Sequence, residues 1–356
     1  MKKLLLLCFL LGVSIGAFAQ VDTLSPITPP LRRSPFIRDM ERITSSRAYR
    51  ITYIGVPLVV AGLVVQERDH GFRHLRNDYV PSFRFRYDDY LQYAPAALML
   101  GLKIGGVRGR SSWGRMLVSD AFSVALMAGA VNSLKYTCRM PRPDGSNNKS
   151  FPSGHTATAF MAATMLHKEY GGRSPWYSIA GYSMATVTGV SRMLNNKHWL
   201  SDVLVGAGIG ILSVELGYLF ADLIFKDKGL TEFEQDFFYD RYCRPSFFGM
   251  EVSTDVVIGR YRPVAGVEGE FNAGVNLGIE GAWFMNPYVG FGGRTAVSSV
   301  PIKLNVAEST DRLDSWAASA GAYFSYPITA RWRTGGKVLA GYQYYESFSL
   351  NGYTLG

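Results

Sequence analysis

Three short clusters of polar residues in the middle of the chain have the residue types and spacing needed to hold an anion and to move protons on it. They are Lys135 with Arg142-Pro143, Pro152-Ser153-Gly154-His155, and Ser191-Arg192 with His198 and Asp202. The guanidinium of Arg142 is a planar fork that matches the oxygens of a phosphate group, whereas Lys135 supplies a compact charge. Together with Arg192 they provide three cations, which favours the chemistry of a bound oxyanion.

The second and third clusters add a helix start and a histidine–carboxylate pair. Ser153 and Gly154 come directly before the apolar stretch 155–168, and they predict a helix whose first N–H groups and positive dipole end favour an oxyanion. His198 and Asp202 are four residues apart, which on one helical turn places the carboxylate beside an imidazole nitrogen. Such a partner fixes the tautomer of the ring and raises the basicity of its other nitrogen.

Each cluster taken singly is more often structural, because lysines and arginines usually lie on solvated faces and a Ser-Gly-His segment usually forms a turn. Their joint occurrence changes this interpretation. Eleven positions in three ordered blocks are specified at once, and chance produces such a match with negligible frequency. We therefore predict that the three clusters form one site.

Apolar segments rich in Ala, Gly and Met must position these clusters. We expect six helices, over residues 51–65, 90–106, 116–134, 155–168, 177–190 and 200–224. A chain of 356 residues exceeds the usual size of one hydrophobic core, so we expect two units. The first is a helical domain over 45–225, and a charged, aromatic connector at 226–245 leads to the second.

From residue 246 onward the composition favours strands. Residues 246–356 contain 16 Gly and only two Lys, with many aromatic residues and period-2 alternation. We expect an antiparallel, barrel-like β domain of about six long strands, with turns or bulges at Asn286-Pro287, Gly292-Gly293 and Gly335-Gly336. An outer-membrane-type barrel and a soluble β-sandwich both fit this pattern. A closed barrel usually needs at least about eight strands, so that interpretation implies that Gly356 is not the natural end.

The start of the chain predicts secretion. Residues 1–19 combine the basic Met1-Lys2-Lys3, a short apolar run and the small-residue site Ala17-Phe18-Ala19, which is typical of a cleaved signal peptide. A linker at 20–44 follows it. An uncleaved signal anchor is the alternative, but the apolar run is shorter than the roughly 20 residues of a membrane span.

The overall composition limits the class of protein. Hydrophobic residues make up 47% and charged residues 18%, which excludes a disordered chain. The net charge is +9, yet residues 246–356 hold eight Lys and Arg against nine Asp and Glu, so the positive excess lies in the first 245 residues. Three cysteines are too few for a disulfide framework.

The clusters resemble the three-part signature of the type-2 phosphatidic acid phosphatase and vanadium haloperoxidase superfamily, K-x6-R-P, P-S-G-H and S-R-x5-H-x3-D, at every position. The resemblance covers residues 45–225. It implies a helical bundle, two-step phosphoryl transfer and no metal or other cofactor for the phosphatase members. On this resemblance the phosphate is bound by Lys135, Arg142, Arg192, Ser153 and the Gly154 amide. It also implies that His198 attacks phosphorus, Asp202 orients His198, and His155 protonates the leaving group and then activates water.

The apolar helices, signal peptide and β region together resemble lipid phosphatases of Gram-negative envelopes, including lipid A 4′-phosphatase-like proteins. We therefore expect a phosphorylated lipid and a membrane as partners, and no nucleic acid. Lipid A phosphate is the first expected substrate, followed by a prenyl diphosphate such as undecaprenyl diphosphate and by phosphatidate-type lipids. The alternatives are a nonspecific secreted acid phosphatase, a vanadium-dependent haloperoxidase and a non-catalytic envelope anchoring barrel.

Membrane topology follows from parity. A cleaved signal peptide places residue 20 in the periplasm, and an outer-membrane barrel requires residue 245 to lie there too, so the helical domain must cross the inner membrane an even number of times. Six crossings place the site in the cytoplasm, and zero crossings place it in the periplasm. Several segments are too short to span, and charged residues lie within or beside them. We expect a periplasm-facing helical domain associated with a membrane of the Gram-negative envelope, with an integral inner-membrane protein as the alternative.

Overall fold

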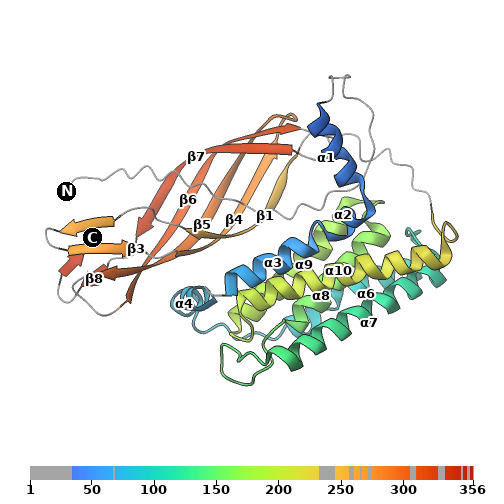
Figure 1. Ribbon diagram of the computed structural model, residues 1–356, viewed down its shortest axis with the longest axis horizontal. Coiled ribbons are helices and arrows are strands. Elements are labelled where there is room, and N and C mark those ends of the chain that lie inside the picture. The colour runs from blue at the N-terminus through green and yellow to red at the C-terminus, as the bar shows by residue number, and fades with distance from the viewer. Residues whose placement is uncertain are drawn as a thin grey trace. The chain divides into compact units, whose positions relative to one another are not determined.

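The chain forms two compact units in a computed structural model, which we call the helical unit and the sheet unit (Figure 1). The structure describes residues 34–66, 69–231, 245–255, 260–264, 267–271, 274–304, 310–327, 333–345, 348–350 and 353–355. The predicted signal peptide, most of the predicted linker and most of the connector lie outside these residues.

The helical unit contains ten helices among its described residues. They are α1 (Pro35–Ser45), α2 (Arg47–Thr52), α3 (Gly55–Val65), α4 (Asp69–Tyr79), α5 (Asp88–Leu91), α6 (Ala94–Ile104), α7 (Trp113–Cys138), α8 (Gly154–Tyr170), α9 (Pro175–Leu194) and α10 (Leu200–Phe225). Each of the six expected segments overlaps one of the apolar helices, but the count of six is not confirmed. The additional α1, α2, α4 and α5 are short or rich in charge, so a search for long apolar segments missed them, and α1 lies largely in the predicted linker.

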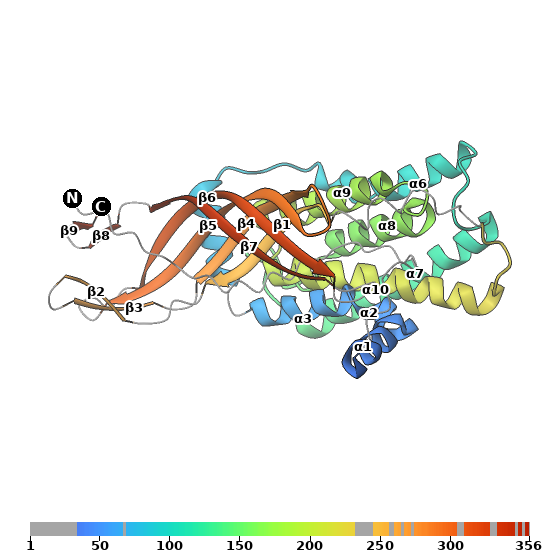
Figure 2. The ribbon, with the colours of Figure 1, turned by 90° about the horizontal axis from the view of Figure 1, so that it is seen from above.

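Helix α10 is the centre of the helical unit. It packs against α3, α7 and α8, and α8 lies between α10 and α9 (Figure 2). The buried core is made mainly of methionine, aliphatic and tyrosine side chains from α6, α7, α8 and α10. Helices α7 and α10 are antiparallel, because Asp222 near the end of α10 pairs with Arg115 near the start of α7.

Glycines allow these helices to approach closely. A Cβ atom at Gly210 of α10 would clash with the carbonyl oxygen of Ala157 and lie 2.9 Å from the backbone nitrogen of Met161 on α8. At Gly208 a Cβ atom would lie 2.6 Å from the carbonyl oxygen of Gly55 on α3. Alternating glycines therefore bring α10 against two neighbours on different sides, as small residues do where helices pack backbone to backbone.

The outer surface of the helical unit is strongly apolar. Leu63 and Val64 on α3, Leu117 on α7, and Leu223 and Ile224 on α10 are all more than half exposed. Helices α7 and α10 are each 26 residues long and apolar enough to cross a membrane, and only 22% of the most apolar window of α7 is buried. Exposed apolar area on this scale marks a surface that meets lipid or another protein.

The sheet unit contains a meander of antiparallel strands and one separate hairpin. Its strands are β1 (Phe247–Asp255), β2 (Arg260–Val264), β3 (Val267–Phe271), β4 (Gly274–Phe284), β5 (Val289–Leu304), β6 (Thr310–Pro327), β7 (Arg333–Tyr345), β8 (Phe348–Leu350) and β9 (Tyr353–Leu355). The long strands follow the order β1-β4-β5-β6-β7, and the β2-β3 hairpin continues the sheet beside β5. Within the described residues β1 pairs only with β4, and β7 only with β6, so the expected barrel closure is not found.

One face of the sheet exposes apolar side chains, and the other buries polar and apolar side chains together. Along β4, Asn276 and Glu280 are buried whereas Ile279 and Trp283 are exposed. The carboxylate of Glu280 accepts a hydrogen bond from Lys337 at 2.6 Å, so the buried charge is paired. The same buried face also carries Ala282 and Phe284, which pack with Tyr323 in a small apolar cluster.

We predict that Gly210→Ala destabilises the helical unit by about 1–3 kcal/mol, because the added methyl group meets backbone atoms of α8 that cannot move aside. The matched control is Gly129→Ala in the interior of α7, where a Cβ atom would have nothing within 4 Å. That substitution should be neutral or stabilise by up to about 1 kcal/mol through helix propensity. Thermal unfolding of the detergent-solubilised chain measures both, and equal effects would contradict the packing described.

Candidate active site

The first two sequence clusters meet where α7 ends and α8 begins. Lys135 lies in the last turn of α7 and donates a hydrogen bond to the carbonyl oxygen of Lys149 at 3.0 Å. Its Cε atom passes beside Gly154, where a Cβ atom would lie 3.8 Å away. Ser153 is the N-cap of α8, and its fully buried hydroxyl lies 2.8 Å from that of Thr156. The Lys135 ammonium and the N-terminus of α8 thus face the same region.

His198 and Asp202 lie at the start of α10 and are both buried. Nδ1 of His198 is 3.5 Å from Oδ2 of Asp202. His198 does not belong to the helix itself, since Trp199 is the N-cap, but the carboxylate still lies beside the imidazole. Because Nδ1 faces Asp202, Nε2 is the ring nitrogen left for chemistry.

The Asp202 side chain also fixes its surroundings. It accepts a hydrogen bond from the backbone N–H of Trp199 at 2.8 Å and one from the hydroxyl of Ser150. Its main-chain carbonyl accepts from the N–H of Ser153 at 3.0 Å, which joins the start of α10 to the start of α8. One residue therefore connects all the elements that carry the two histidines.

Arg142 lies in the loop between α7 and α8, and this loop is attached to the start of α10. Nε1 of Trp199 donates to the carbonyl oxygen of Pro141 at 2.9 Å, and Lys197 forms an ion pair with Asp144 at 2.6 Å. The Nε atom of Arg142 is buried without a hydrogen-bond partner. Its guanidinium is therefore held near the histidines with a donor still to be satisfied.

Arg192 and His155 are held by two carboxylates that the sequence analysis missed. Nη1 of Arg192 donates to Oδ2 of the fully buried Asp88 at 2.8 Å, and Nε2 of His155 lies 3.0 Å from Oδ1 of Asp89. Both aspartates belong to the single-turn helix α5. Asn195 fixes α5 in place, because its amide donates to the carbonyl oxygen of Phe85 at 2.6 Å. The sequence offered one signal for these two residues, which is that they are adjacent within an aromatic segment. Their distance along the chain from the three clusters did not indicate that they belong to the same site.

The electrostatics of the site favour a bound anion and a neutral histidine. Burial lowers the pKa of His198 to about 4, although Asp202 opposes the shift, so the ring is neutral at neutral pH. Burial and the charge of Arg192 lower the pKa of His155, and Asp89 partly offsets them. Burial and the charge of Arg192 also lower the pKa of Arg142, because two guanidinium groups lie close together. An anion between them would relieve this repulsion.

The structure brings all eight predicted site residues into one cluster. Lys135 is within electrostatic range of Arg142, Arg192 and Asp202, and His198 is within range of Lys135 and Arg192. Within the part of the chain that the structure describes, no group of three or more His, Cys, Asp or Glu side chains is arranged to hold a metal ion. The arrangement is suited to holding an oxyanion between cations and a helix start, with one neutral imidazole beside it.

Comparison with known proteins identifies a curated relative and two solved structures. Lipid A 1-phosphatase of Porphyromonas gingivalis is 53% identical over 173 residues, which are 48% of this chain and 39% of that protein. The chain thus spans well under half the length of this relative. Two crystal structures have a TM-score of 0.32 with this chain. The structure of LpxE from Aquifex aeolicus is 24% identical and covers 40% of this chain and 92% of its own. A PAP2-type phosphatidylglycerolphosphate phosphatase of Bacillus subtilis is 19% identical and covers 49% of this chain and 100% of its own.

The family match covers the second half of the helical unit. Residues 117–225 match the model of the PAP2 superfamily. This range runs from the first turns of α7 to the end of α10, and it includes every predicted site residue and the loops between them. The part of the helical unit that carries the candidate site is therefore similar to the PAP2 superfamily.

Proposed function

We propose that the helical unit removes a phosphate group from a membrane lipid through a phosphohistidine intermediate. The observation that carries this proposal is the neutral, buried His198, held by Asp202 within reach of Lys135 and Arg192. A loose phosphoryl transition state needs positioning and charge stabilisation more than covalent chemistry from the protein. The cations and the N-terminus of α8 supply both.

The reaction proceeds in two steps. Nε2 of His198 attacks phosphorus, the N–P bond forms and the P–O ester bond breaks, and His155 donates its proton to the leaving oxygen. Water then attacks phosphorus, His155 accepts a proton from that water, and the N–P bond breaks to release inorganic phosphate. Arg142, Arg192, Lys135, Ser153 and the N–H of Gly154 bind the phosphoryl oxygens throughout.

Asp88 and Asp89 act as positioning residues in this proposal. The buried Asp88 fixes the guanidinium plane of Arg192, and Asp89 holds Nε2 of His155. The Asp89 carboxylate also raises the pKa of His155 against the opposing effects of burial and Arg192. A histidine that must donate a proton benefits from this partner, because more of it is protonated at a given pH.

The proposed substrate is a phosphorylated lipid, with lipid A first. The helical unit has exposed apolar surface on α3, α7 and α10, which suits a substrate that stays in a bilayer. The similarity to a protein described as lipid A 1-phosphatase favours the 1-phosphate of lipid A over the 4′-phosphate that the sequence resemblance suggested. Undecaprenyl diphosphate and phosphatidate-type lipids follow as alternatives.

The proposed address is the Gram-negative envelope, with the active site facing the periplasm. We propose that residues 1–19 are the signal peptide, that 45–225 form the catalytic domain and that 246–356 form the β domain. The apolar surface of the helices and the apolar face of the sheet support membrane association. An integral inner-membrane protein is the alternative arrangement.

We predict that His198→Ala abolishes turnover and the covalent phosphoenzyme, because the proposal gives no other residue the role of nucleophile. Rapid quenching with a labelled phosphate ester, followed by digestion, measures the phosphohistidine. Wild-type activity should persist in EDTA and be blocked by vanadate. Labelled phosphohistidine recovered from His198→Ala would falsify the assignment, and halide oxidation by the vanadate-loaded chain would favour the haloperoxidase alternative.

We predict that His155→Ala slows hydrolysis of alkyl phosphates by about 10²–10⁴-fold and of 4-nitrophenyl phosphate much less, since a good leaving group needs little protonation. Asp89→Asn should slow hydrolysis less than His155→Ala does, and it should again slow the alkyl phosphates more than 4-nitrophenyl phosphate. It should also move the falling limb of the kcat/KM profile to lower pH, because the carboxylate that raises the His155 pKa is gone.

The control for Asp89→Asn is Asp39→Asn, which removes an exposed carboxylate from α1 and should leave the pH profile unchanged. The ionisation of the substrate phosphate is common to all variants, so only the difference between profiles reports on His155. A uniform loss on both substrates with an unmoved limb would mean that Asp89 has only a structural role.

We predict that deletion of the gene raises the phosphate content of envelope lipid A at the 1-position, which mass spectrometry of extracted lipids measures. Complementation with wild type should restore the lipid, and His198→Ala should not. Accumulation of undecaprenyl diphosphate with unchanged lipid A would reverse the first two substrates. Unchanged lipids with strong hydrolysis of small phosphate esters would point to a secreted acid phosphatase.

A further inference from the structure

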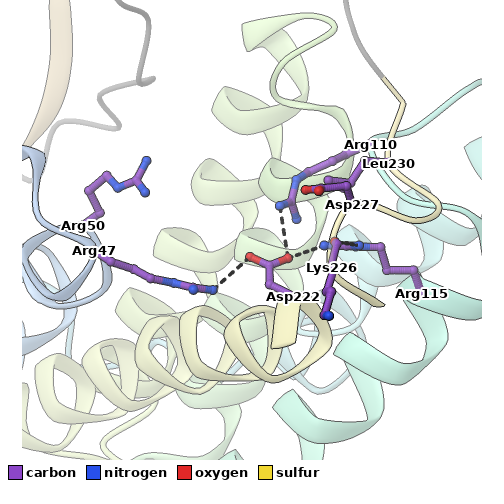
Figure 3. A pocket seen from close by; sticks show the side chains of 8 residues that line it. All are labelled: Arg47, Arg50, Arg110, Arg115, Asp222, Lys226, Asp227 and Leu230. Atoms are coloured by element: carbon purple, nitrogen blue, oxygen red, sulfur yellow. Dashed lines mark hydrogen bonds and ion pairs between the residues drawn. The ribbon is translucent and has the colours of Figure 1, made fainter. Parts of the chain in front are cut away.

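A second basic site lies in the helical unit, away from the cluster of signature residues. A cavity of about 360 Å³ is lined by Arg47, Arg50, Arg110, Arg115, Asp222, Lys226, Asp227 and Leu230 (Figure 3). Its size is within the range of small-molecule pockets. Five cations and two carboxylates line it, so the lining is basic.

Asp222 organises the arginines but does not neutralise them. Its carboxylate lies 3.3 Å from Nη2 of Arg47 and 3.5 Å from Nη2 of Arg110, and it also accepts from Arg115 (Figure 3). Nη1 of Arg110 is buried without a hydrogen-bond partner. A buried guanidinium nitrogen of this kind is costly unless an acceptor reaches it, so the cavity is suited to an anion rather than a cation.

The wall of the cavity is rigidly built. Arg115 is 1% exposed, and its Nη1 donates to the carbonyl oxygens of Lys226 at 2.6 Å and Lys228 at 2.9 Å. The N–H of Ser112 donates to the carbonyl oxygen of Gly229 at 2.7 Å, which ties the start of α7 to the turn after α10. Gly229 has φ +76°, so this turn needs a residue without a side chain. A preorganised cavity binds a ligand with less loss of entropy.

The position of the cavity separates it from catalysis. It lies where α7 begins and α10 ends, whereas the signature residues lie where α7 ends and α10 begins. Helices of 26 residues are about 39 Å long, so one ligand cannot occupy both places.

Exposed apolar side chains follow lining residues of the cavity on the same two helices. Leu117 comes two residues after Arg115 on α7 and is 54% exposed, and Leu223 and Ile224 come directly after Asp222 on α10 and are 60% and 59% exposed. A basic cavity at the end of apolar helices offers polar contacts to a phosphate and apolar contacts to hydrocarbon chains. That combination fits an anionic phospholipid, whose headgroup lies at the same depth as the ends of membrane-facing helices.

We propose that this cavity binds the phosphate headgroup of an anionic glycerophospholipid, at a site distinct from the proposed active site. Arg47, Arg50 and Arg110 contact the phosphate, and Leu223 and Ile224 contact the acyl chains. The proposal does not depend on which lipid the catalytic site hydrolyses.

The first test uses inorganic phosphate as the probe. The full chain in detergent carries Arg142→Ala, so that the signature cluster no longer competes for the anion. Phosphate should raise its unfolding temperature saturably, beyond the effect of chloride at equal ionic strength. Arg47→Gln combined with Arg50→Gln should weaken phosphate binding about tenfold or more, because hydrogen bonds to charged groups are removed.

The matched control is Arg42→Gln, which removes one exposed charge from α1 outside the cavity. It should leave phosphate binding unchanged. The double variant, made without Arg142→Ala, should still hydrolyse a soluble phosphate ester, which separates this site from failure of the proposed function. Weakening by Arg42→Gln as large as that by the double variant would overturn the proposal, because it would reflect the general field of the protein.

The second test distinguishes the source of the phosphate. Native mass spectrometry should detect phosphatidylglycerol retained by the chain in mixed micelles, with less phosphatidylcholine retained and with loss of retention in the double variant. Retention of phosphatidylglycerol supports the proposal whether or not free phosphate also binds. Binding of free phosphate without this retention overturns the lipid assignment, and binding of neither probe overturns the site.

Discussion

The buried carboxylate of Asp202 is the interaction on which the catalytic end of the helical unit depends. Its side chain caps α10 through the N–H of Trp199, holds Ser150 of the preceding loop and lies beside His198, while its carbonyl oxygen binds the N–H of Ser153. A buried charge is costly unless it is paired and hydrogen-bonded, and here the helix N-terminus and the neighbouring cations meet that requirement. The same residue that orients the proposed nucleophile therefore also sets where α8 and α10 meet. Removing it would leave a cluster of cations without their central anion, and loss of activity alone would not separate its two roles.

The cations of the site repel one another, and the chain offsets this by pairing one of them with a carboxylate. Arg192 is 7% exposed and would be costly to bury alone, but Asp88 accepts a hydrogen bond from it at 2.8 Å. Burial and the charge of Arg192 still lower the pKa of Arg142, so the compensation is incomplete. The remaining positive potential is what a phosphate would neutralise. The carboxylates thus compensate part of the charge of the buried cations and leave a positive potential that favours binding of an anion.

The sequence predicted the site residues whose spacing along the chain is fixed, and it did not predict those without such a spacing. The signature residues have fixed spacing because the chain must bring them from three helix ends to one point, so spacing alone located them. Asp88 and Asp89 contact the same site from α5, but a pair of carboxylates carries no spacing relative to the clusters and was not recognised. In the β region, composition predicted antiparallel strands, whereas Gly292 and Gly293, expected to form a turn or bulge, lie within β5 opposite Ala282 and Gly281. A Cβ atom at Gly292 would lie 2.7 Å from the Cα of Ala282, so close approach of strands, rather than chain reversal, explains these glycines.

Helix α10 carries a carboxylate at each end, and the two ends differ in what they require. Asp202 in the first turn is favoured by the helix dipole, but Asp222 lies one turn before the C-terminus, where the dipole disfavours negative charge. Arg47, Arg110 and Arg115 surround Asp222 and more than offset that penalty. Part of the basic cluster therefore stabilises the end of the helix. Nη1 of Arg110 is different, because it is buried and has no hydrogen-bond partner among the described residues. This unmet donor makes the cavity a place for a ligand rather than only a helix cap.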